Sequence, residues 1–401
     1  MPNRKRLRAF ATAAIAAAAL VSAGSFSASA QSEPSPSDTR SSPAPLHKSS
    51  KAIKGRYIVT LSAAADPDEV VKRLGLKSQY SYKSAMRGFA GALSAAQLRT
   101  VRATPGVASV EEDAQITAAP VKSAARAVPA TSWGLDRIDQ PELPLDDQFN
   151  VIGRGTGTTG YILDTGIEYG HAQFGGRARA GFDAVGDGRG GQDCNGHGTH
   201  VAGTVAGETF GVAPAADLVS VRVLNCEGSG TWSGVIAGLD WVAQNAETPA
   251  VLNASLGGPR SNAVNSAVAA LFNSGVLPVV AAGNESSDAC DVSPASAPNA
   301  FTVGASDEQD DEASFSNYGT CLDIYAPGTN IVSARLGGGS VAHNGTSMAS
   351  PHVAGVALLA LETAPMATPD EVAGFLDTEA TPNTLTVSAG SPNRLLFTGS
   401  L

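Results

Sequence analysis

The segment VLPVVAAGN at residues 276–284 decides the fold class, because its first seven residues are all apolar. A strand without polar alternation is typical of a parallel sheet that helices cover on both faces. Four further strand candidates lie at residues 160–163, 218–224, 251–256 and 301–305, and helical candidates at residues 197–206, 231–246, 262–273 and 347–361. This alternation predicts a doubly wound α/β domain with a mainly parallel sheet over residues 131–401.

Charge is divided unevenly along the 401 residues. Residues 1–127 hold 18 basic and 8 acidic residues, a net charge of +10, whereas residues 128–401 hold 9 Arg, no Lys and 29 acidic residues, a net charge of −20. The overall charge of −10 argues against a dedicated nucleic-acid binder. The hydrophobic content of 43% supports a sizeable core and excludes wholesale disorder. The division suggests a basic partner built into the chain beside an acidic main domain.

Residues 1–30 are typical of a secretory signal peptide. A basic head of Arg4, Lys5, Arg6 and Arg8 precedes an apolar run, and small residues end the segment before Gln31. The run is shorter than the ~20 residues that a membrane-spanning helix needs. We therefore expect export, and no membrane attachment once the signal is removed.

A small domain is expected before the main one. Residues 31–54 are rich in Ser and Pro and predict a disordered linker. Residues 55–118 then alternate as β-α-β-β-α-β, with Asp66-Pro67 and Ser94 as helix starts, which indicates a ferredoxin-like α+β domain.

Three polar segments lie where strands of the main domain end or helices begin, which is where doubly wound sheets bind ligands. Asp164 ends a strand and, taken alone, is explained by a turn. The segment NGHGTHVAG at residues 195–203 has two histidines three residues apart, but it lacks the glutamate of a zinc-binding H-E-x-x-H motif. The segment GTSMASPHVAG at residues 345–355 places Ser347 where a loop becomes a helix, and Pro351 conflicts with that helix.

Together these segments resemble the subtilisin-like serine peptidases, in particular their proteinase K-like branch, over about residues 130–390. The chain order Asp, His, Ser is that of subtilisin. The resemblance implies that His197 is the base for the nucleophile Ser347, that Asp164 orients His197, and that Asn284 donates to the oxyanion beside the N–H of Ser347. The other histidines are weaker candidates for the base. We expect His200 to pack or hydrogen-bond on its helix, His352 to lie one turn after Ser347 on the same helix, and His171 and His343 to be surface or loop residues.

The resemblance also implies how a peptide substrate binds. Two glycine-rich segments, Gly228-Ser229-Gly230 and Ser255-Leu256-Gly257, would flank it as added strands. Small residues at 281–283, among them Ala282 and Gly283, would wall a pocket for a large apolar or aromatic side chain, with Glu285 at its rim. This predicts a broad endopeptidase that also tolerates Lys or Arg.

The four cysteines, Cys194, Cys226, Cys290 and Cys321, allow three disulfide connectivities, and the sequence alone does not choose among them. Export favours disulfides over zinc. The resemblance implies the pairs Cys194–Cys226 and Cys290–Cys321.

An acidic exported domain suits structural Ca²⁺. The resemblance implies one site at Asp323 with the carbonyls of Pro298 and Ala300. A second candidate set lies near the expected start of the mature chain: Asp136, Asp139, Gln140 and Asp146.

The basic front domain resembles the inhibitor-type propeptide of this family, which implies that it assists folding and blocks the cleft until it is cut in a processing region at residues 119–130. The mature enzyme, residues 131–401, is expected to be a secreted monomer that acts on protein and peptide substrates. Two alternatives are an esterase-type relative, which the absence of G-x-S-x-G and the late position of Ser347 disfavour, and a non-catalytic relative, which the complete triad disfavours.

Overall fold

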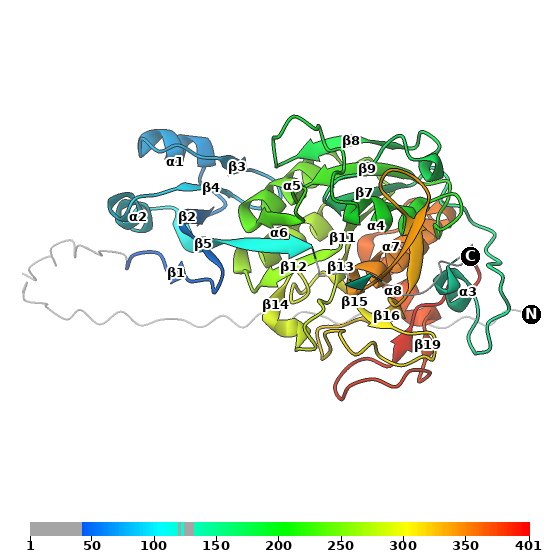
Figure 1. Ribbon diagram of the computed structural model, residues 1–401. Helices are drawn as coiled ribbons and strands as arrows, with labels where there is room; N and C mark the ends of the chain where they lie inside the picture. The colour runs from blue at the N-terminus through cyan, green and yellow to red at the C-terminus, as the bar shows by residue number, and fades with distance from the viewer. Residues whose placement is uncertain (1–41, 119–121, 124–131) are drawn as a thin grey trace, which may run out of the picture. The chain divides into compact units, whose positions relative to one another are not determined.

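The computed structural model describes residues 42–118, 122–123 and 132–401. The expected signal peptide (1–30), the first part of the expected linker and all but two residues of the expected processing region lie outside the described residues. The front domain comprises residues 44–118, and the main domain comprises residues 132–401 (Figure 1).

The front domain has the expected ferredoxin-like order of elements. Its elements are β2 (Ala52–Leu61), α1 (Pro67–Arg73), β3 (Tyr80–Tyr82), β4 (Gly88–Ala92), α2 (Ala95–Arg102) and β5 (Val107–Ala118). The antiparallel sheet runs in the order β5-β2-β4-β3. Asp66 and Ser94 cap the two helices through their side chains, as the sequence predicts.

The expected linker at residues 31–54 is partly wrong. Leu46–His47 forms β1, which pairs in parallel with β5, and β2 already begins at Ala52. Backbone hydrogen bonds hold this segment on β5, because Val110 N donates to Pro45 O and Gln115 N donates to Lys51 O. The composition is that of a linker, but β5 has a free edge to which this segment adds a strand.

The main domain is built on a nine-stranded sheet in the order β19-β20-β16-β15-β13-β11-β7-β9-β8, with parallel neighbours except for β19 and β20. Its strands are β7 (Thr159–Asp164), β8 (Ala178–Asp183), β9 (Asp217–Arg222), β11 (Ala250–Ala254), β13 (Leu277–Ala281), β15 (Phe301–Ser306), β16 (Ile324–Pro327), β19 (Thr381–Pro382) and β20 (Arg394–Leu395). From β7 the chain passes to β8 at the edge of the sheet and returns to β9 beside β7, then continues from β11 on the other side of β7. The switch in strand order therefore lies at β7 and β11.

Helices cover both faces of this sheet. On one face α4 (His197–Ala206) and α7 (Thr346–Thr363) pack against Ile162 of β7, and on the other α5 (Trp232–Asn245) and α6 (Asn262–Asn273) pack with its neighbours Tyr161 and Leu163. Further helical elements are α3 (Trp133–Ile138), η1 (Ala172–Phe174), η2 (Ala289–Asp291) and α8 (Pro369–Glu379). Pro351 lies inside the continuous helix α7.

Short strands outside the main sheet complete the domain: β10 (Ser229–Thr231), β12 (Leu256–Pro259), β14 (Val292–Ser293), β17 (Ile331–Ala334) and β18 (Ser340–Asn344). The predicted strand at residues 251–256 is therefore too long. Ser255 separates β11 from β12, and β12 leaves the main sheet to pair with β14 and β5.

Candidate active site

Asp164 and His197 form a buried pair at the switch in strand order. Asp164 is the last residue of β7, and His197 is the first residue of α4, after Gly196 with a φ of 106°. His197 Nδ1 lies 2.7 Å from Asp164 Oδ1, and Thr165 N donates to the same oxygen at 2.7 Å. Burial alone lowers the pKa of the imidazole, but the charge and hydrogen bond of Asp164 outweigh burial, so the pKa of His197 is raised. The pair holds the imidazole with Nε2 as the acceptor.

Ser347 is the second residue of α7 and is fully buried. Its Oγ donates to the carbonyl of Ser255 at 3.2 Å, and among the described residues His197 Nε2 has no hydrogen-bond partner. The Ser347 hydroxyl is thus turned toward the carbonyl of the residue that precedes β12, and no hydrogen bond joins it to His197 in the described part of the chain. Hydrogen bonds of catalytic serines often tighten only on reaction.

Asn284 follows β13 and faces the start of α7. Its Oδ1 accepts hydrogen bonds from Thr346 N and Thr346 Oγ1, both at 2.8 Å. A Cβ on Gly345 would come within 3.1 Å of Asn284 Nδ2, so the amide nitrogen lies beside the turn that leads to Ser347. The amide is therefore oriented by the residue before the predicted nucleophile. Sequence reasoning missed this role of Thr346, and its position beside Ser347 was the one available signal.

A chain of buried hydrogen bonds, also missed, connects α7 to β11. Ser350 Oγ donates to Asn253 Oδ1 at 2.8 Å, and Asn253 Nδ2 donates to Ser255 Oγ at 2.9 Å. Ser255 Oγ then donates to the carbonyl of Ser347 at 3.0 Å. These hydrogen bonds fix α7 against the segment that is expected to bind substrate.

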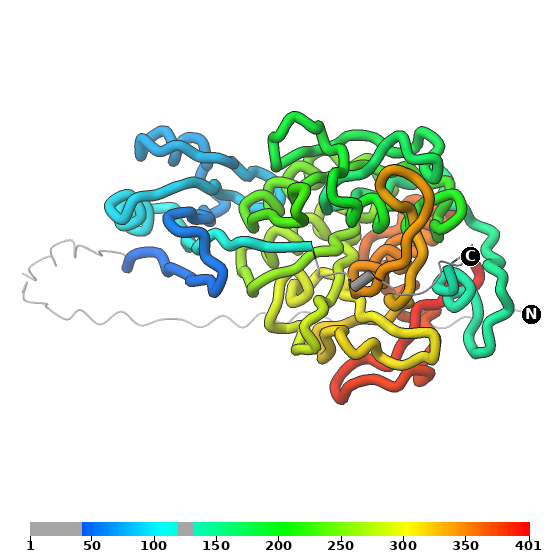
Figure 2. The backbone as a smooth tube through the Cα atoms, in the orientation of Figure 1, coloured from blue at the N-terminus to red at the C-terminus, as the bar shows by residue number. Residues whose placement is uncertain are grey.

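The two expected substrate segments hold the end of the front domain. Strand β5 lies antiparallel between β10 and β12, with Ile116 opposite Gly230 and Thr117 opposite Gly257. Ala118 N donates to Gly228 O at 2.8 Å. In Figure 2 this cyan strand enters the green and yellow main domain. Strand β5 of the chain itself therefore pairs with the two edge strands in the way that a peptide substrate is expected to pair with them.

The structure describes the chain again after residues 119–121. Lys122–Ser123 forms β6, antiparallel to β18, with Lys122 opposite Asn344 and Ser123 opposite His343. Because β18 ends three residues before Ser347, the described residues on both sides of the 119–121 gap are paired with walls of the candidate site.

The expected pocket wall consists of small buried residues. Ala282 is fully buried, and Gly283 has a φ of 106°. Glu285 is exposed beside them. Its Oε2 accepts from Asn317 Nδ2 at 3.1 Å, and Asn317 Nδ2 also donates to Ala282 O at 2.9 Å. Glu285 is thus held next to the predicted wall.

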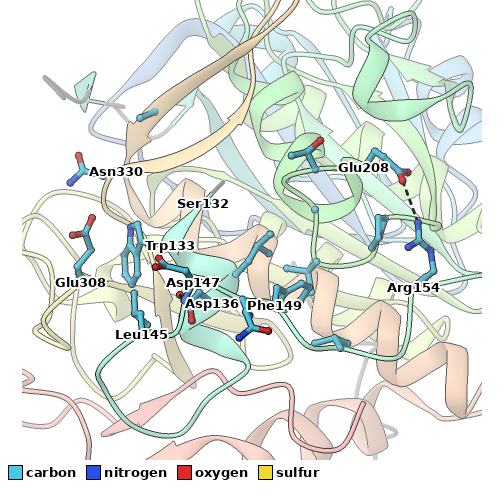
Figure 3. Close-up of a pocket in the computed structure, with 18 of the residues that line it drawn as sticks. Ser132, Trp133, Asp136, Leu145, Asp147, Phe149, Arg154, Glu208, Glu308 and Asn330 are labelled. Atoms are coloured by element: carbon cyan, nitrogen blue, oxygen red, sulfur yellow. Dashed lines mark hydrogen bonds and ion pairs between the residues drawn. The ribbon is translucent and has the colours of Figure 1, made fainter. Parts of the chain in front are cut away.

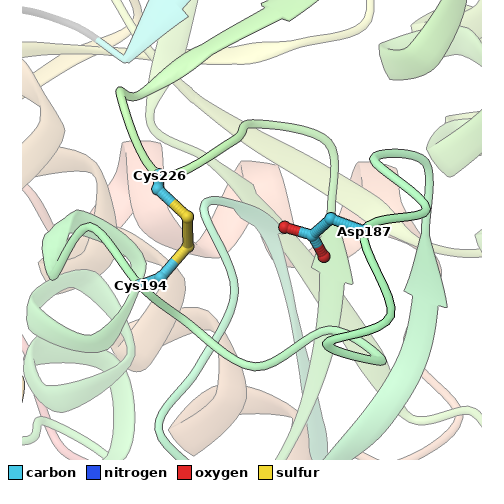
Figure 4. Close-up of side chains that lie close together, drawn as sticks. All are labelled: Asp187, Cys194 and Cys226. Carbon is cyan, nitrogen blue, oxygen red and sulfur yellow. A yellow bond between two sulfur atoms is a disulfide. The ribbon is translucent and has the colours of Figure 1, made fainter.

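Both implied disulfides are present, Cys194–Cys226 and Cys290–Cys321. The first joins the loop before His197 to the chain before Gly228. Cys194 and Cys226 also lie with Asp187 in the one group of at least three His, Cys, Asp or Glu residues of the described chain whose ligand atoms all approach within 4.8 Å (Figure 4). Disulfide sulfurs are poor metal ligands, and Asp187 forms an ion pair with Arg222, so this group does not fit a metal ion.

The two predicted calcium sites differ in the structure. Asp323 directly precedes β16, while Pro298 and Ala300 precede its neighbour β15, so all three lie at the same end of two paired strands. Burial raises the pKa of Asp323 to about 6, although Thr302 N donates to its carboxylate at 2.7 Å. A carboxylate in this state fits a hard cation.

The second set is not assembled as a ligand cluster. Asp136 accepts the N–H groups of Asp146 and Asp147, and Asp139 accepts that of Asn150. Figure 3 shows Asp136 and Asp147 together at a cavity of about 730 Å³. Within the described residues the carboxylates of Asp136, Asp139 and Asp146 do not all lie within 4.8 Å of one another. Their oxygens cap turns of the backbone instead.

The remaining histidines are structural. His200 Nε2 lies 3.1 Å from the carbonyls of Ile331 and Val341, and His352 Nδ1 lies 2.8 Å from Met348 O. His171 lies in a loop, as expected, but is buried there and caps η1. His343 is half-buried in β18 rather than in a loop, and it packs on His200 with ring centroids 4.6 Å apart.

Comparison with known proteins agrees with this geometry. Residues 155–395 match the model of the subtilase family, and residues 56–119 match that of the peptidase inhibitor I9 family. The extracellular serine proteinase of Thermus sp. (strain Rt41A) is 46% identical over 389 residues, covering 90% of this chain and 93% of the relative. The alkaline serine exoprotease A of Vibrio alginolyticus is 43% identical, covering 90% and 70%.

Among solved structures, a cold-adapted subtilisin-like serine proteinase is 50% identical with a TM-score of 0.66, covering 67% of this chain and 99% of that one. A search of the described residues for membrane spans finds none, since no helix there is both long and apolar enough.

Proposed function

The chain belongs to the subtilase family of serine peptidases and carries an I9-type inhibitor domain, and from this premise we propose that it is a secreted, self-processing endopeptidase of broad specificity. One observation carries the proposal. The chain's own strand β5 lies between β10 and β12 and ends at Ala118, opposite Leu256, and the carbonyl of the preceding Ser255 accepts a hydrogen bond from Ser347 Oγ. The alternatives of an esterase or a non-catalytic relative have no need of that arrangement.

Each residue has a stated step in this chemistry. Ser347 Oγ attacks the peptide carbonyl while His197 Nε2 takes its proton, and His197 then returns the proton to the leaving amine. Water repeats the sequence on the acyl-enzyme and releases the acid. Asp164 stabilises the imidazolium that forms in each half. Asn284 Nδ2 and the N–H of Ser347 stabilise the oxyanion, at the N-terminal end of α7.

The front domain is proposed as inhibitor and folding assistant. Asp113 accepts hydrogen bonds from Ser233 N and Ser233 Oγ at the start of α5, and Glu111 accepts from Ala263 N at the start of α6. In return Asp240 of α5 accepts the N–H groups of residues 83–85. The front domain thereby stabilises two helices that a folding main domain must place.

The register of the flanking strands also supports a position for the first cut. Ala118 lies opposite Leu256, and the carbonyl of the residue before Leu256, Ser255, accepts from Ser347 Oγ. Lys122 lies opposite Asn344 on the other side. The first cut is therefore proposed within residues 119–122, and any further trimming toward residue 131 would follow it.

Asn284→Ala is expected to lower kcat about 10²–10³-fold with little change in KM, a magnitude known from a subtilisin, because the oxyanion loses a donor that acts only in the transition state. Steady-state kinetics on a peptide amide measures it. Thr346→Val should give a smaller loss and Thr346→Ser almost none, because Thr346 Oγ1 only orients the amide. A rise in KM with kcat unchanged would contradict the assignment of Asn284 to the oxyanion.

Specificity is proposed to favour large apolar or aromatic side chains before the cut bond, with Lys and Arg tolerated through Glu285. Glu285→Gln is expected to lower the Lys-to-Phe ratio of kcat/KM about fivefold, as loss of an exposed charge pair would. Asp291→Asn removes an exposed acid outside the pocket and should leave the ratio unchanged. If the Lys-to-Phe ratio of kcat/KM is unchanged in both variants, Glu285 does not lie at the pocket rim.

Calcium is proposed at Asp323 with the carbonyls of Pro298 and Ala300, where it would supply positive charge and stabilise the folded chain. A chelator is expected to lower the Tm of the Ser347→Ala full chain, by the equivalent of about 2.7 kcal/mol if the ion is present at 100 times its Kd. In the Asp323→Asn background the chelator shift should vanish. If that shift persists there and vanishes in Asp139→Asn, the ion binds at the second set.

A further inference from the structure

We propose that Asp193 is a positioning residue of the active site, which holds the His197 end of α4 against the end of β7. This rests on the proposed function, since it concerns how His197 is held for its reaction with Ser347. Sequence reasoning passed over Asp193, four residues before His197.

Asp193 accepts five hydrogen bonds in a nearly buried site. Its Oδ1 accepts from Thr165 Oγ1 at 2.9 Å and from the backbone N–H groups of Asn195 and Gly196 at 2.8 and 3.0 Å. Its Oδ2 accepts from Thr199 N at 2.9 Å and from Thr199 Oγ1 at 2.6 Å. One carboxylate thus satisfies the residues on both sides of His197, and all but one of these donors belong to the start of α4 or the turn that leads into it.

The fifth donor ties this turn to the other half of the catalytic pair. Thr165 directly follows Asp164, and its Oγ1 accepts from Gly198 N at 2.9 Å while it donates to Asp193. A Cβ on Gly198 would collide with the backbone of Gly166, so α4 and the end of β7 are in close contact here. The distance of 2.7 Å between His197 Nδ1 and Asp164 Oδ1 depends on this contact between α4 and the end of β7.

Asp193 also contributes charge to the site. The ionisable groups that act on His197 are the carboxylates of Asp164 and Asp193 and the imidazoles of His200 and His343. Both neighbouring imidazoles have pKa values that burial lowers, so they are neutral at pH 7. The two carboxylates both raise the pKa of His197. Asp193 therefore affects the reaction by geometry and by charge, and these two effects can be separated.

Two pairs of variants of the full chain, matured by self-processing, separate them. Asp193→Asn removes the charge and should lower kcat ~10²-fold at unchanged KM, as a small misplacement of a catalytic group does. It should also move the acid limb of the kcat/KM profile to lower pH. Asp193→Glu keeps the charge and should lose kcat with the acid limb unmoved. Thr165→Val removes the hydrogen bonds of Thr165 Oγ1 with Asp193 and Gly198, so it should lower kcat without moving the acid limb. The matched Thr165→Ser should behave like the wild type.

An acid limb that Asp193→Asn leaves in place, or a Thr165→Val variant with wild-type kcat, would overturn the proposal. If Asp193→Asn has no cooperative melting transition, the Thr165 pair decides alone. An inactive wild type would instead mean that the proposed function has failed.

Discussion

Ser347→Ala is expected to lower turnover about 10⁶-fold without unfolding the chain, a magnitude known for subtilisin. The variant removes the atom that forms the acyl-enzyme, and alanine in the first turn of a buried helix leaves α7 intact. The mature variant can be prepared by cutting the precursor with trace wild-type enzyme, which a fluorophosphonate then inactivates. The rates at which the two mature forms hydrolyse a peptide amide and casein give the fold-loss of turnover.

Three results bear on the assignment. The fluorophosphonate should label wild type at Ser347 and leave the variant unlabelled, whereas labelling of the variant would point to another nucleophile. Hydrolysis of short esters without casein hydrolysis by wild type would favour the esterase alternative. Equal Tm values for the wild-type and variant mature forms would show that the lost activity is chemical rather than structural.

Asp310→Asn is expected to lower the stability of the Ser347→Ala full chain by about 3 kcal/mol and its Tm by roughly 4 °C. Arg137 of α3 is fully buried, and its guanidinium donates to both oxygens of Asp310 at 2.7 and 2.9 Å. Neutralising Asp310 leaves a buried cation without its counter-charge. Asparagine suits the φ of 63° at this position, so the backbone adds little strain.

Glu247→Gln is the matched control, because the Arg179–Glu247 pair has the same kind of contact but is exposed on both sides. It should change stability by less than ~1 kcal/mol. A Tm for Asp310→Asn as close to wild type as that of Glu247→Gln would contradict the role of the buried pair. Thermal melting followed by circular dichroism measures both.

Much of the fold was predictable because periodicity and capping are local. The apolar run at 276–282 became β13 of a parallel sheet, and Asp66 and Ser94 cap the helices that they were expected to cap. Pairing between distant segments was not predictable. The chain before residue 55 has the composition of a linker, yet β1 forms because β5 has an open edge 64 residues away.

The site shows the same division. Local patterns place Asp164, His197, Ser347 and Asn284 at strand ends or helix starts, but it is the resemblance of their segments to a known family that assigns them their roles. The residues that hold them were missed, because their partners are remote: Ser350 is 97 residues from Asn253, and Thr165 is 28 residues from Asp193. A polar residue has no signal of its own until the fold supplies its partner.

The intact masses and new N-termini of the wild-type and Ser347→Ala full chains, refolded side by side, test the central claim most directly. We predict that wild type cuts itself within residues 119–122 at a rate independent of protein concentration, and that Ser347→Ala keeps its front domain. Processing of both chains would mean that another peptidase matures the protein. A folded wild type that stays intact would contradict self-cleavage by Ser347.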